Sequence, residues 1–197
     1  MNPKIYSYFF SLLILSPVLS ADQQTKKNQL VQAAKERLSH QVVYDGRYQR
    51  LAYPMGDVAD NRGVCSDVII RSYRALGLDL QKKIHEDMRR HFSAYPKNWG
   101  LKRTDKNIDH RRVPNLQTFF KRQGASLKIS RNPQDYKAGD LVTWRVAGHL
   151  PHIGIVVDQR SKDNKRPLII HNIGLGPKMD DMLFNFPITG HYRYFNF

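Results

Sequence analysis

The chain has 197 residues, of which 41% are hydrophobic, and its 32 Lys and Arg against 17 Asp and Glu give a net charge of +15. This length and composition fit one globular domain with a proper core, and they exclude a repetitive or low-complexity chain. Such a charge attracts polyanions in general, whether cell-wall polymers, lipid headgroups or nucleic acid, and does not choose among them.

The first twenty residues have the pattern of a secretory signal. Lys4 is followed by an apolar run over Tyr6–Leu15, and Ser16-Pro17 ends that run. Because the run is shorter than the roughly 20 apolar residues that span a bilayer, we expect a signal peptide, residues 1–20, cleaved before Ala21. An uncleaved interfacial anchor is the alternative. The mature protein, with net charge +14 after the loss of one lysine, is expected to be exported, periplasmic or secreted, without stable membrane insertion.

The next segment, residues 21–39, is expected to hold a leader and the first helix. Asp22–Asn28 is polar and predicts a loose leader, whereas Thr25–Ser39 has helix formers with apolar residues at helical spacing. Residues 40–197 are then expected to form the domain itself.

The domain begins with short extended pieces and continues with helices. Val42–Tyr53 contains the turn dipeptide Asp-Gly, and Gly56–Gly63 is a polar loop. From Cys65 onward apolar residues recur at three and four positions until Gly77, which predicts a helix with the cysteine in its first turn. A second helix is predicted over Val113–Gln123, where proline near the start and an apolar stripe occur together.

The last third of the sequence changes to short segments rich in Val, Ile and aromatic residues, separated by turn residues. These predicted strands are Asp140–Val146, His152–Asp158, Pro167–Asn172 and Ile188–Phe197. Helices followed by a run of strands predict an α+β domain with an antiparallel sheet.

Cys65 is the only cysteine, so no intramolecular disulfide can form. A buried, inert cysteine is one interpretation. The other is a nucleophile, because unpaired N–H groups and the helix dipole at a first turn favour the thiolate and should lower its pKa. A nucleophilic thiol needs a histidine nearby as its base.

His152 is the strongest candidate for that base. It begins an alternating strand in which Ile153, Ile155 and Val157 share one face and His152 and Gly154 share the other. We expect the glycine to leave room above the sheet for the helix end that carries the cysteine.

His171 ends the next predicted strand and is expected to orient the base. Asn172 is the alternative, because a one-residue change of strand register exchanges the two.

The order of these segments resembles the NlpC-type cell-wall endopeptidases of the papain-like superfamily. The matching stretches are the helix with Cys65, then Ala138–Trp144, His152–Val156 and Ile169–His171. The resemblance implies a papain-like fold, with N-terminal helices and a nucleophile helix packed on a C-terminal antiparallel sheet. It also implies the catalytic residues Cys65, His152 and His171, and no cofactor. The usual Asp-Cys-Ser-Gly signature appears here as Val64–Asp67, which leaves the substrate open.

A second resemblance covers nearly all of the chain after Tyr44. The stretches Gly63–Asp67, Asn107–Asn115 and Leu150–Val156 resemble the family called domain of unknown function 1287 (DUF1287). This resemblance implies relatives without implying a substrate.

Five further residues are candidates for oxyanion or substrate binding. The Cys65 N–H supplies one oxyanion donor, and the hydroxyl of Tyr44 or Tyr53 is a candidate for the second. His110 and Arg111 offer positive charge for a substrate carboxylate, with plain surface charge as the alternative. Asp67, in the first helical turn, is more simply explained by the helix dipole.

Other chemistry is disfavoured. His85-Glu86 lacks the second histidine of a zinc-binding helix, so no metal is expected. Pro177 directly follows the glycines of Gly174–Gly176, and a proline at that place blocks the geometry of a phosphate-binding loop. The sequence predicts a cysteine amidase or endopeptidase acting on cell-wall peptide. We expect cell-wall peptide or another anionic polymer as the partner, and no specific nucleic acid. A non-catalytic module binding an anionic glycan or lipid, and a lipid acyl hydrolase or transferase, are the alternatives.

Overall fold

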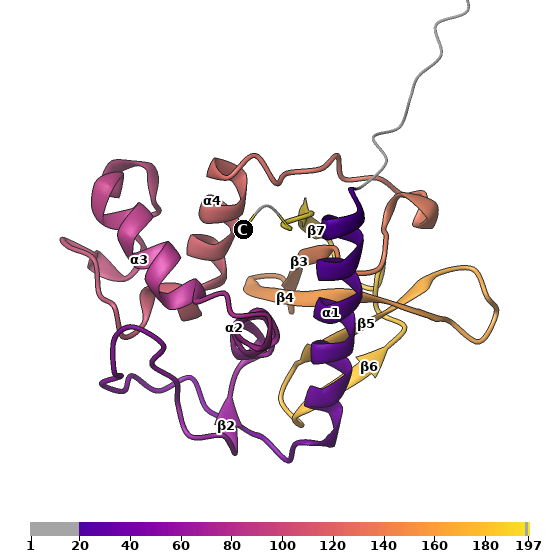
Figure 1. Cartoon of the computed structure of the whole chain (residues 1–197), viewed down its shortest axis with the longest axis horizontal. Helices are drawn as coiled ribbons and strands as arrows, with labels where there is room; N and C mark the ends of the chain where they lie inside the picture. Colours follow the sequence, from indigo (N-terminus) through magenta and orange to yellow (C-terminus); the bar gives the residue numbers. More distant parts are fainter. Residues whose placement is uncertain (1–19, 196) are drawn as a thin grey trace, which may run out of the picture.

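A helical layer and an antiparallel sheet form the structure, as the sequence predicted (Figure 1). The computed structural model describes residues 20–195 and 197, and the α-helices of this part are α1 (Ala21–Glu36), α2 (Cys65–Ala75), α3 (Leu80–Arg90) and α4 (Val113–Arg122). The main strands are β3 (Leu141–Val146), β4 (Leu150–Arg160), β5 (Pro167–Asn172), β6 (Pro177–Asp180) and β7 (Ile188–Tyr192), in the order β6-β5-β4-β3-β7. Two short strands, β1 (Val43–Tyr44) and β2 (Arg62–Gly63), pair in parallel.

Helix α1 begins at Ala21, so the loose leader expected over Asp22–Asn28 is wrong. Ser20 caps the helix, because its hydroxyl accepts from the Gln23 N–H at 3.3 Å and the Gln23 side chain accepts from the Ser20 N–H. An Asp22–Lys26 ion pair of 2.9 Å adds support to this first turn. The expected signal, residues 1–20, lies outside the described residues except for Ser20.

The main core fills the space between the helices and one face of the sheet. In Figure 1, α1 and α2 lie over that face, and α3 and α4 extend the helical layer to one side. The alternation predicted for β4 is confirmed, since Ile153, Ile155 and Val157 all point into this core. Their partners on the helices include Ile69 and Phe120. The opposite face of the sheet packs a smaller cluster around Trp144. No helix of the described part is long and apolar enough to cross a membrane.

Strand β6 was not predicted from the sequence. It starts at a proline and all four of its residues are half-buried, so it lacks the apolar alternation that identifies a strand. Its pairing with β5 sets His171 opposite Lys178 and Ile169 opposite Asp180. This edge strand therefore adds charged side chains beside the strand that carries His171.

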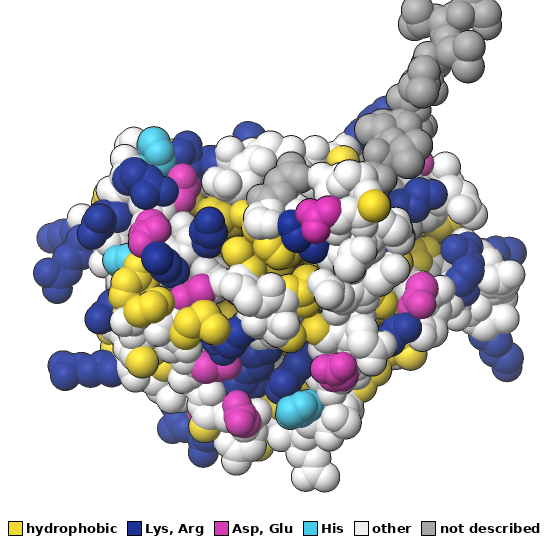
Figure 2. Space-filling model, viewed as in Figure 1, with side chains coloured by type: hydrophobic (Ala, Val, Ile, Leu, Met, Phe, Trp, Pro, Cys, Tyr) yellow, Lys and Arg dark blue, Asp and Glu magenta, His cyan; other side chains and the backbone are white. Residues whose placement is uncertain are grey.

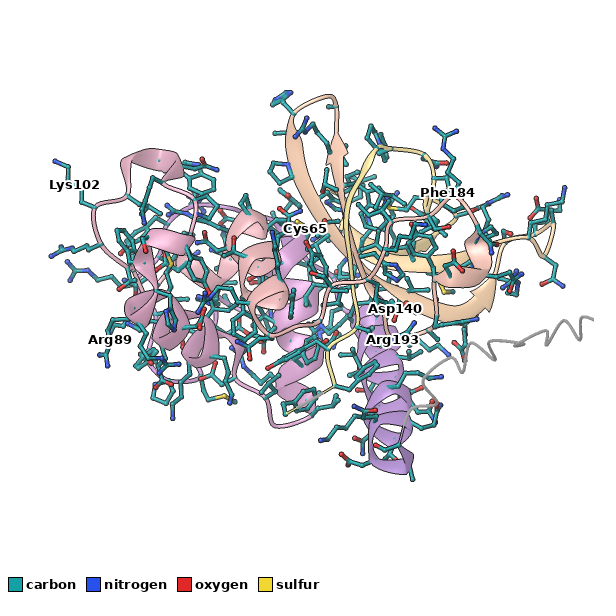
Figure 3. The ribbon with its side chains drawn as sticks, turned by 90° about the horizontal axis from the view of Figure 1, so that it is seen from above. Cys65, Arg89, Lys102, Asp140, Phe184 and Arg193 are labelled. Carbon is teal, nitrogen blue, oxygen red and sulfur yellow. The ribbon has the colours of Figure 1, made fainter. Side chains whose placement is uncertain are left out.

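The aspartate of the Gly-Asp-Leu-Val stretch has a structural role. Asp140 is fully buried, and its carboxylate accepts from His191 at 2.7 Å and from Arg193 at 2.7 and 2.9 Å. Figure 3 shows Asp140 and Arg193 side by side. Because a buried carboxylate is stable only when it is paired, this cluster fixes the start of β3 against β7.

Gly154 does not leave room for a helix end, as we had expected. A Cβ at this position would lie 2.6 Å from Cγ2 of Ile169, 3.0 Å from the carbonyl oxygen of Ile170 and 3.2 Å from Cβ of His171. The space is therefore occupied by β5, while α2 packs on the Ile153 face. The glycine allows His171 to approach β4 closely.

We predict that Gly154→Ala destabilises the protein by about 1–3 kcal/mol, because the added methyl overpacks the β4–β5 contact. Urea unfolding followed by circular dichroism measures the change. Gly46→Ala is the control, since its Cβ would meet only Val64, at 3.5 Å, and a change within about 0.5 kcal/mol is expected. Equal stability of the two variants would show that β5 can move away without cost.

Candidate active site

Cys65 is the first residue of α2 and lies where the helices meet the sheet (Figure 3). The backbone N–H groups of Ile153, Ser66 and Cys65 itself interact with the sulfur. The side chain is buried, with 4% of the residue exposed, yet it lines a cavity of about 420 Å³. The thiol is therefore covered by protein on most sides and reaches a pocket on the remaining one.

The expected lowering of the Cys65 pKa is wrong. Burial raises the pKa of the thiol to about 11, against the opposing effect of the N–H groups, and the Asp67 carboxylate raises it further. The loss of hydration destabilises a buried thiolate by more than a single helix N-terminus stabilises it. The resting site therefore holds a neutral thiol.

A chain of hydrogen bonds connects three side chains of neighbouring strands. Nε2 of His152 lies 3.0 Å from Nδ1 of His171, and Nε2 of His171 lies 3.0 Å from the Asp180 carboxylate. Both histidines are buried, and the His152 ring lies 6.1 Å from the ring of Trp144 on the smaller-cluster face. The structure thus brings together the predicted base and its predicted orienting residue, and adds an acid.

The charge of Asp180 fixes the tautomers along this chain. Although burial opposes it, hydrogen bonds from Lys178 and His171 hold the pKa of Asp180 below its usual value, so the carboxylate is ionised at neutral pH. An ionised carboxylate only accepts, hence Nε2 of His171 carries the proton and its Nδ1 is a bare acceptor. His152 must then donate from Nε2. Its Nδ1 keeps a free lone pair, which is the state that a general base requires.

Burial and the neighbouring His171 lower the pKa of His152 to about 3. Burial also lowers the pKa of His171, in spite of the Asp180 carboxylate. Both rings are therefore neutral across the physiological range. Among the described residues, no hydrogen bond joins His152 to Cys65. The thiol instead contacts the N–H of Ile153, the residue that follows His152.

Asn172 does not contact the base. Its amide donates to the Gly63 carbonyl at 3.5 Å and accepts from the Gly174 N–H at 3.1 Å. In the register that β5 adopts, His171 therefore contacts His152, and Asn172 instead holds the loop before Cys65.

Tyr44 lies beside the thiol and lines the same cavity. Burial, followed by its interaction with Cys65, raises the pKa of the Tyr44 phenol to about 12, so the hydroxyl keeps its proton as a potential donor. Tyr53 is elsewhere: its ring packs edge-on against His85, with centroids 5.3 Å apart, and it does not line the cavity. Of the two tyrosines, only Tyr44 lies in the cavity beside Cys65.

Asp67 and Arg111 form a buried ion pair beneath the site. The guanidinium donates two hydrogen bonds of 2.9 Å to the carboxylate, whose second oxygen also accepts from the Val64 N–H at 2.7 Å. Asp67 therefore holds Arg111 and the residue before Cys65 in place. Arg111 lines the cavity, but its pairing leaves it little capacity to bind a substrate carboxylate.

His110 was expected near the surface as part of a carboxylate-binding pair, and this is wrong. The residue is 2% exposed, it does not line the cavity, and burial lowers its pKa to about 4. The one-turn 3-10 helix η4 (Asp109–Arg111) points its polar residues inward, a reversal that the charged sequence does not reveal.

Two residues of the site were missed from the sequence. Asp180 belongs to the unpredicted strand β6, and only its pairing with β5 indicates a role. Arg112 directly follows η4 and lines the cavity beside Cys65. The described residues contain no group of three or more His, Cys, Asp or Glu that could hold a metal ion.

Comparison with known proteins identifies relatives over most of the chain. A family model described as domain of unknown function (DUF1287) matches residues 31–194. A protein of Escherichia coli (strain K12), described as uncharacterized protein YijF, is 51% identical over 166 residues, which make up 84% of this chain and 80% of the relative. The resemblance to this family seen in the sequence is confirmed.

Alkylation by iodoacetamide should report whether His152 accepts the Cys65 proton. In His152→Ala we expect the rate to rise about tenfold per pH unit toward the thiol pKa of about 11, since only the thiolate reacts. In the wild type, His152 is neutral above its pKa of about 3, so it can assist and the rise should be shallower, with rates at pH 7 at least about tenfold higher than in the variant.

His85→Ala is the control for loss of a half-buried imidazole away from the thiol. It should reproduce the wild-type profile. Identical profiles for wild type and His152→Ala would mean that no proton passes from the thiol to this ring.

Proposed function

Because the chain belongs to the DUF1287 family, whose description names no activity, we propose its function from its site: an exported cysteine amidase or endopeptidase with Cys65 as nucleophile and His152 as base. The observation that carries the proposal is the hydrogen-bonded chain from Asp180 through His171 to His152. It leaves one imidazole lone pair free, and the residue after that imidazole touches the thiol.

The arrangement supports a papain-like reaction without a preformed ion pair. Nδ1 of His152 takes the thiol proton as the sulfur attacks an amide carbonyl, and the imidazolium then protonates the leaving amine. Water, deprotonated by the same ring, releases the acyl group from Cys65. Asp180 and His171 act as positioning residues, because they hold the tautomer of His152 and stabilise its charged form.

The oxyanion of the tetrahedral intermediate needs donors in place beforehand. The backbone N–H of Cys65 at the start of α2 is one donor. The protonated hydroxyl of Tyr44 is the second in this proposal, since it lies against the sulfur and faces the same cavity.

The substrate class follows from the resemblance to NlpC-type enzymes and from the charge. Figure 2 shows Lys and Arg side chains spread over the visible face, with a few Asp and Glu among them. Such a surface favours contact with an anionic polymer. Cell-wall peptide, which combines amide bonds with an anionic matrix, fits both requirements.

A second candidate function is a non-catalytic module that binds an anionic glycan or lipid. The observation that favours it is the raised pKa of Cys65, together with the lack of a hydrogen bond from the thiol to His152 in the described structure. In that case Cys65 would be an inert buried residue.

Digestion of purified peptidoglycan separates the two functions. We expect the wild type to release new peptide or glycan fragments, read by mass spectrometry, and Cys65→Ala to lower this activity by at least about a thousandfold, because the nucleophile is lost. Arg131→Ala, which removes an exposed charge, is the control. Fragments released equally by wild type and Cys65→Ala would end the cysteine-hydrolase proposal, and binding without release would favour the module.

Asp180→Asn tests the positioning chain. The amide cannot carry the negative charge that fixes the tautomers, so we expect activity to fall by about tenfold or more. In this variant the nitrogen chemical shifts of His152 should show that the ring proton is shared between Nδ1 and Nε2, instead of residing on Nε2 alone.

Asp181→Asn is the matched control, because the neighbouring carboxylate pairs with Arg166 on the surface. It should leave both measurements unchanged. Unaltered histidine shifts in Asp180→Asn would show that Asp180 does not determine the tautomers.

A further inference from the structure

The cavity beside Cys65 is lined by positive charge and, among the described residues, by no acidic residue. Its walls include the aromatic rings of Tyr44, Tyr48 and Trp99, and its charged lining residues are Arg111 and Arg112. No Asp or Glu lines it in the described part of the chain. Since the Arg111 guanidinium is hydrogen-bonded to Asp67, Arg112 is the lining arginine whose N–H donors remain available.

We propose that Arg112 binds a carboxylate of the substrate, so that the enzyme prefers peptides with a free carboxylate next to the amide that Cys65 attacks. This rests on the proposed hydrolase function and specifies its substrate. The role first expected of His110 and Arg111 thus passes to the next residue along the chain.

The guanidinium of Arg112 makes no side-chain hydrogen bond within residues 20–195 and 197. Its Nη1 is buried without a hydrogen-bond partner, and it forms only a long ion pair with Asp109, at 3.9 Å, beyond hydrogen-bonding distance. Burial also raises the pKa of Asp109 to about 6, which weakens it as a counter-ion in mildly acidic conditions. A guanidinium that makes no hydrogen bond within the protein keeps its N–H donors available for an added anion.

Trp99 holds this guanidinium in place. The Arg112 guanidinium carbon lies 4.3 Å from the centroid of the Trp99 ring, whose residue is 58% exposed. This contact with the aromatic ring restricts the guanidinium, and it uses none of the N–H donors that bind a carboxylate. The ring and the arginine together make a preorganised anion site.

The distance between this arginine and the thiol is fixed by the first turn of α2. Ser66, which follows Cys65, donates to the carbonyl oxygen of Arg111 at 2.7 Å. Asp67, the next residue, binds the Arg111 side chain. Arg112 therefore follows a residue that is attached twice to the nucleophile's own helix turn, which explains how both reach the same cavity.

Binding to the inactive Cys65→Ala protein tests the proposal separately from catalysis. Three probes are compared by calorimetry and by Trp fluorescence: N-acetyl-alanyl-alanine, its C-terminal amide, and N-acetyl-glutamyl-alanine amide. The first carries a terminal carboxylate, the third a side-chain carboxylate, and the second none. We expect at least one acid to bind about tenfold or more tightly than the neutral amide, as a charge-assisted hydrogen-bond pair requires.

Arg112→Gln should abolish this preference, Arg112→Lys should retain part of it, and Lys102→Gln, which removes an exposed charge, should keep it in full. The two acids then identify the terminal or the side-chain carboxylate as the group recognised. Equal binding of acids and amide, no binding of any probe, or an undiminished preference in Arg112→Gln would overturn the proposal. Binding preference with no hydrolysis by the wild type would instead reject the hydrolase alone.

Discussion

The buried ion pair between Asp67 and Arg111 is the constraint on which the site depends. Arg111 also donates to the carbonyl oxygens of Asp45, at 3.1 Å, and Arg47, at 3.4 Å, so one guanidinium joins the start of α2, the loop after β1 and η4. Both side chains are almost inaccessible, at 2% and 3%. A pair of this kind contributes little net stability. Loss of one partner, however, leaves an unpaired buried charge and destabilises the folded protein by about 3–5 kcal/mol. The ion pair matters for position, because it holds Tyr44, Cys65 and Arg112 around one cavity.

The sheet supplies the other half of the site by close packing rather than charge. Gly154 lets β5 approach β4, which brings His171 to hydrogen-bonding distance of His152. β6 then completes the chain from outside, because its register puts Asp180 within 3.0 Å of His171. Different contacts therefore position Cys65 at the start of α2 and His152 on β4, and the two elements meet where the Cys65 sulfur contacts the N–H of Ile153.

The sequence was informative wherever local patterns determine structure. Periodicity and Gly77 predicted α2 with Cys65 at its start, and alternation predicted which face of β4 enters the core. These are properties of one element read alone. The pairing of His152 with His171 was also predicted, because adjacent strands with polar ends limit the choices to His171 and Asn172.

The residues that the sequence misplaced depend on contacts between elements. His110 sits in a charged stretch that reads as surface, yet η4 turns it inward against α3 and α4. Asp180 has no apolar pattern around it, and its partner is known only from the β5–β6 register. The Cys65 pKa was misjudged for the same reason, since a helix dipole is visible in the sequence whereas the depth of burial is not.

The neutral thiol also bears on the presence of a lone cysteine in a chain expected to be exported. Thiolates, not thiols, are oxidised, so a nucleophile that stays ionised at rest would be lost in an oxidising compartment with no second cysteine to rescue it. Burial of Cys65 keeps the sulfur protonated, and the lowered pKa of His152 keeps its ring neutral but also makes it a weak base. Both shifts oppose an ion pair in the empty site, so transfer of the thiol proton requires an acyl group that accepts the sulfur at the same time. A buried, high-pKa cysteine that contacts the N–H of the residue after a tautomer-fixed histidine therefore supports catalysis only if deprotonation and attack occur together.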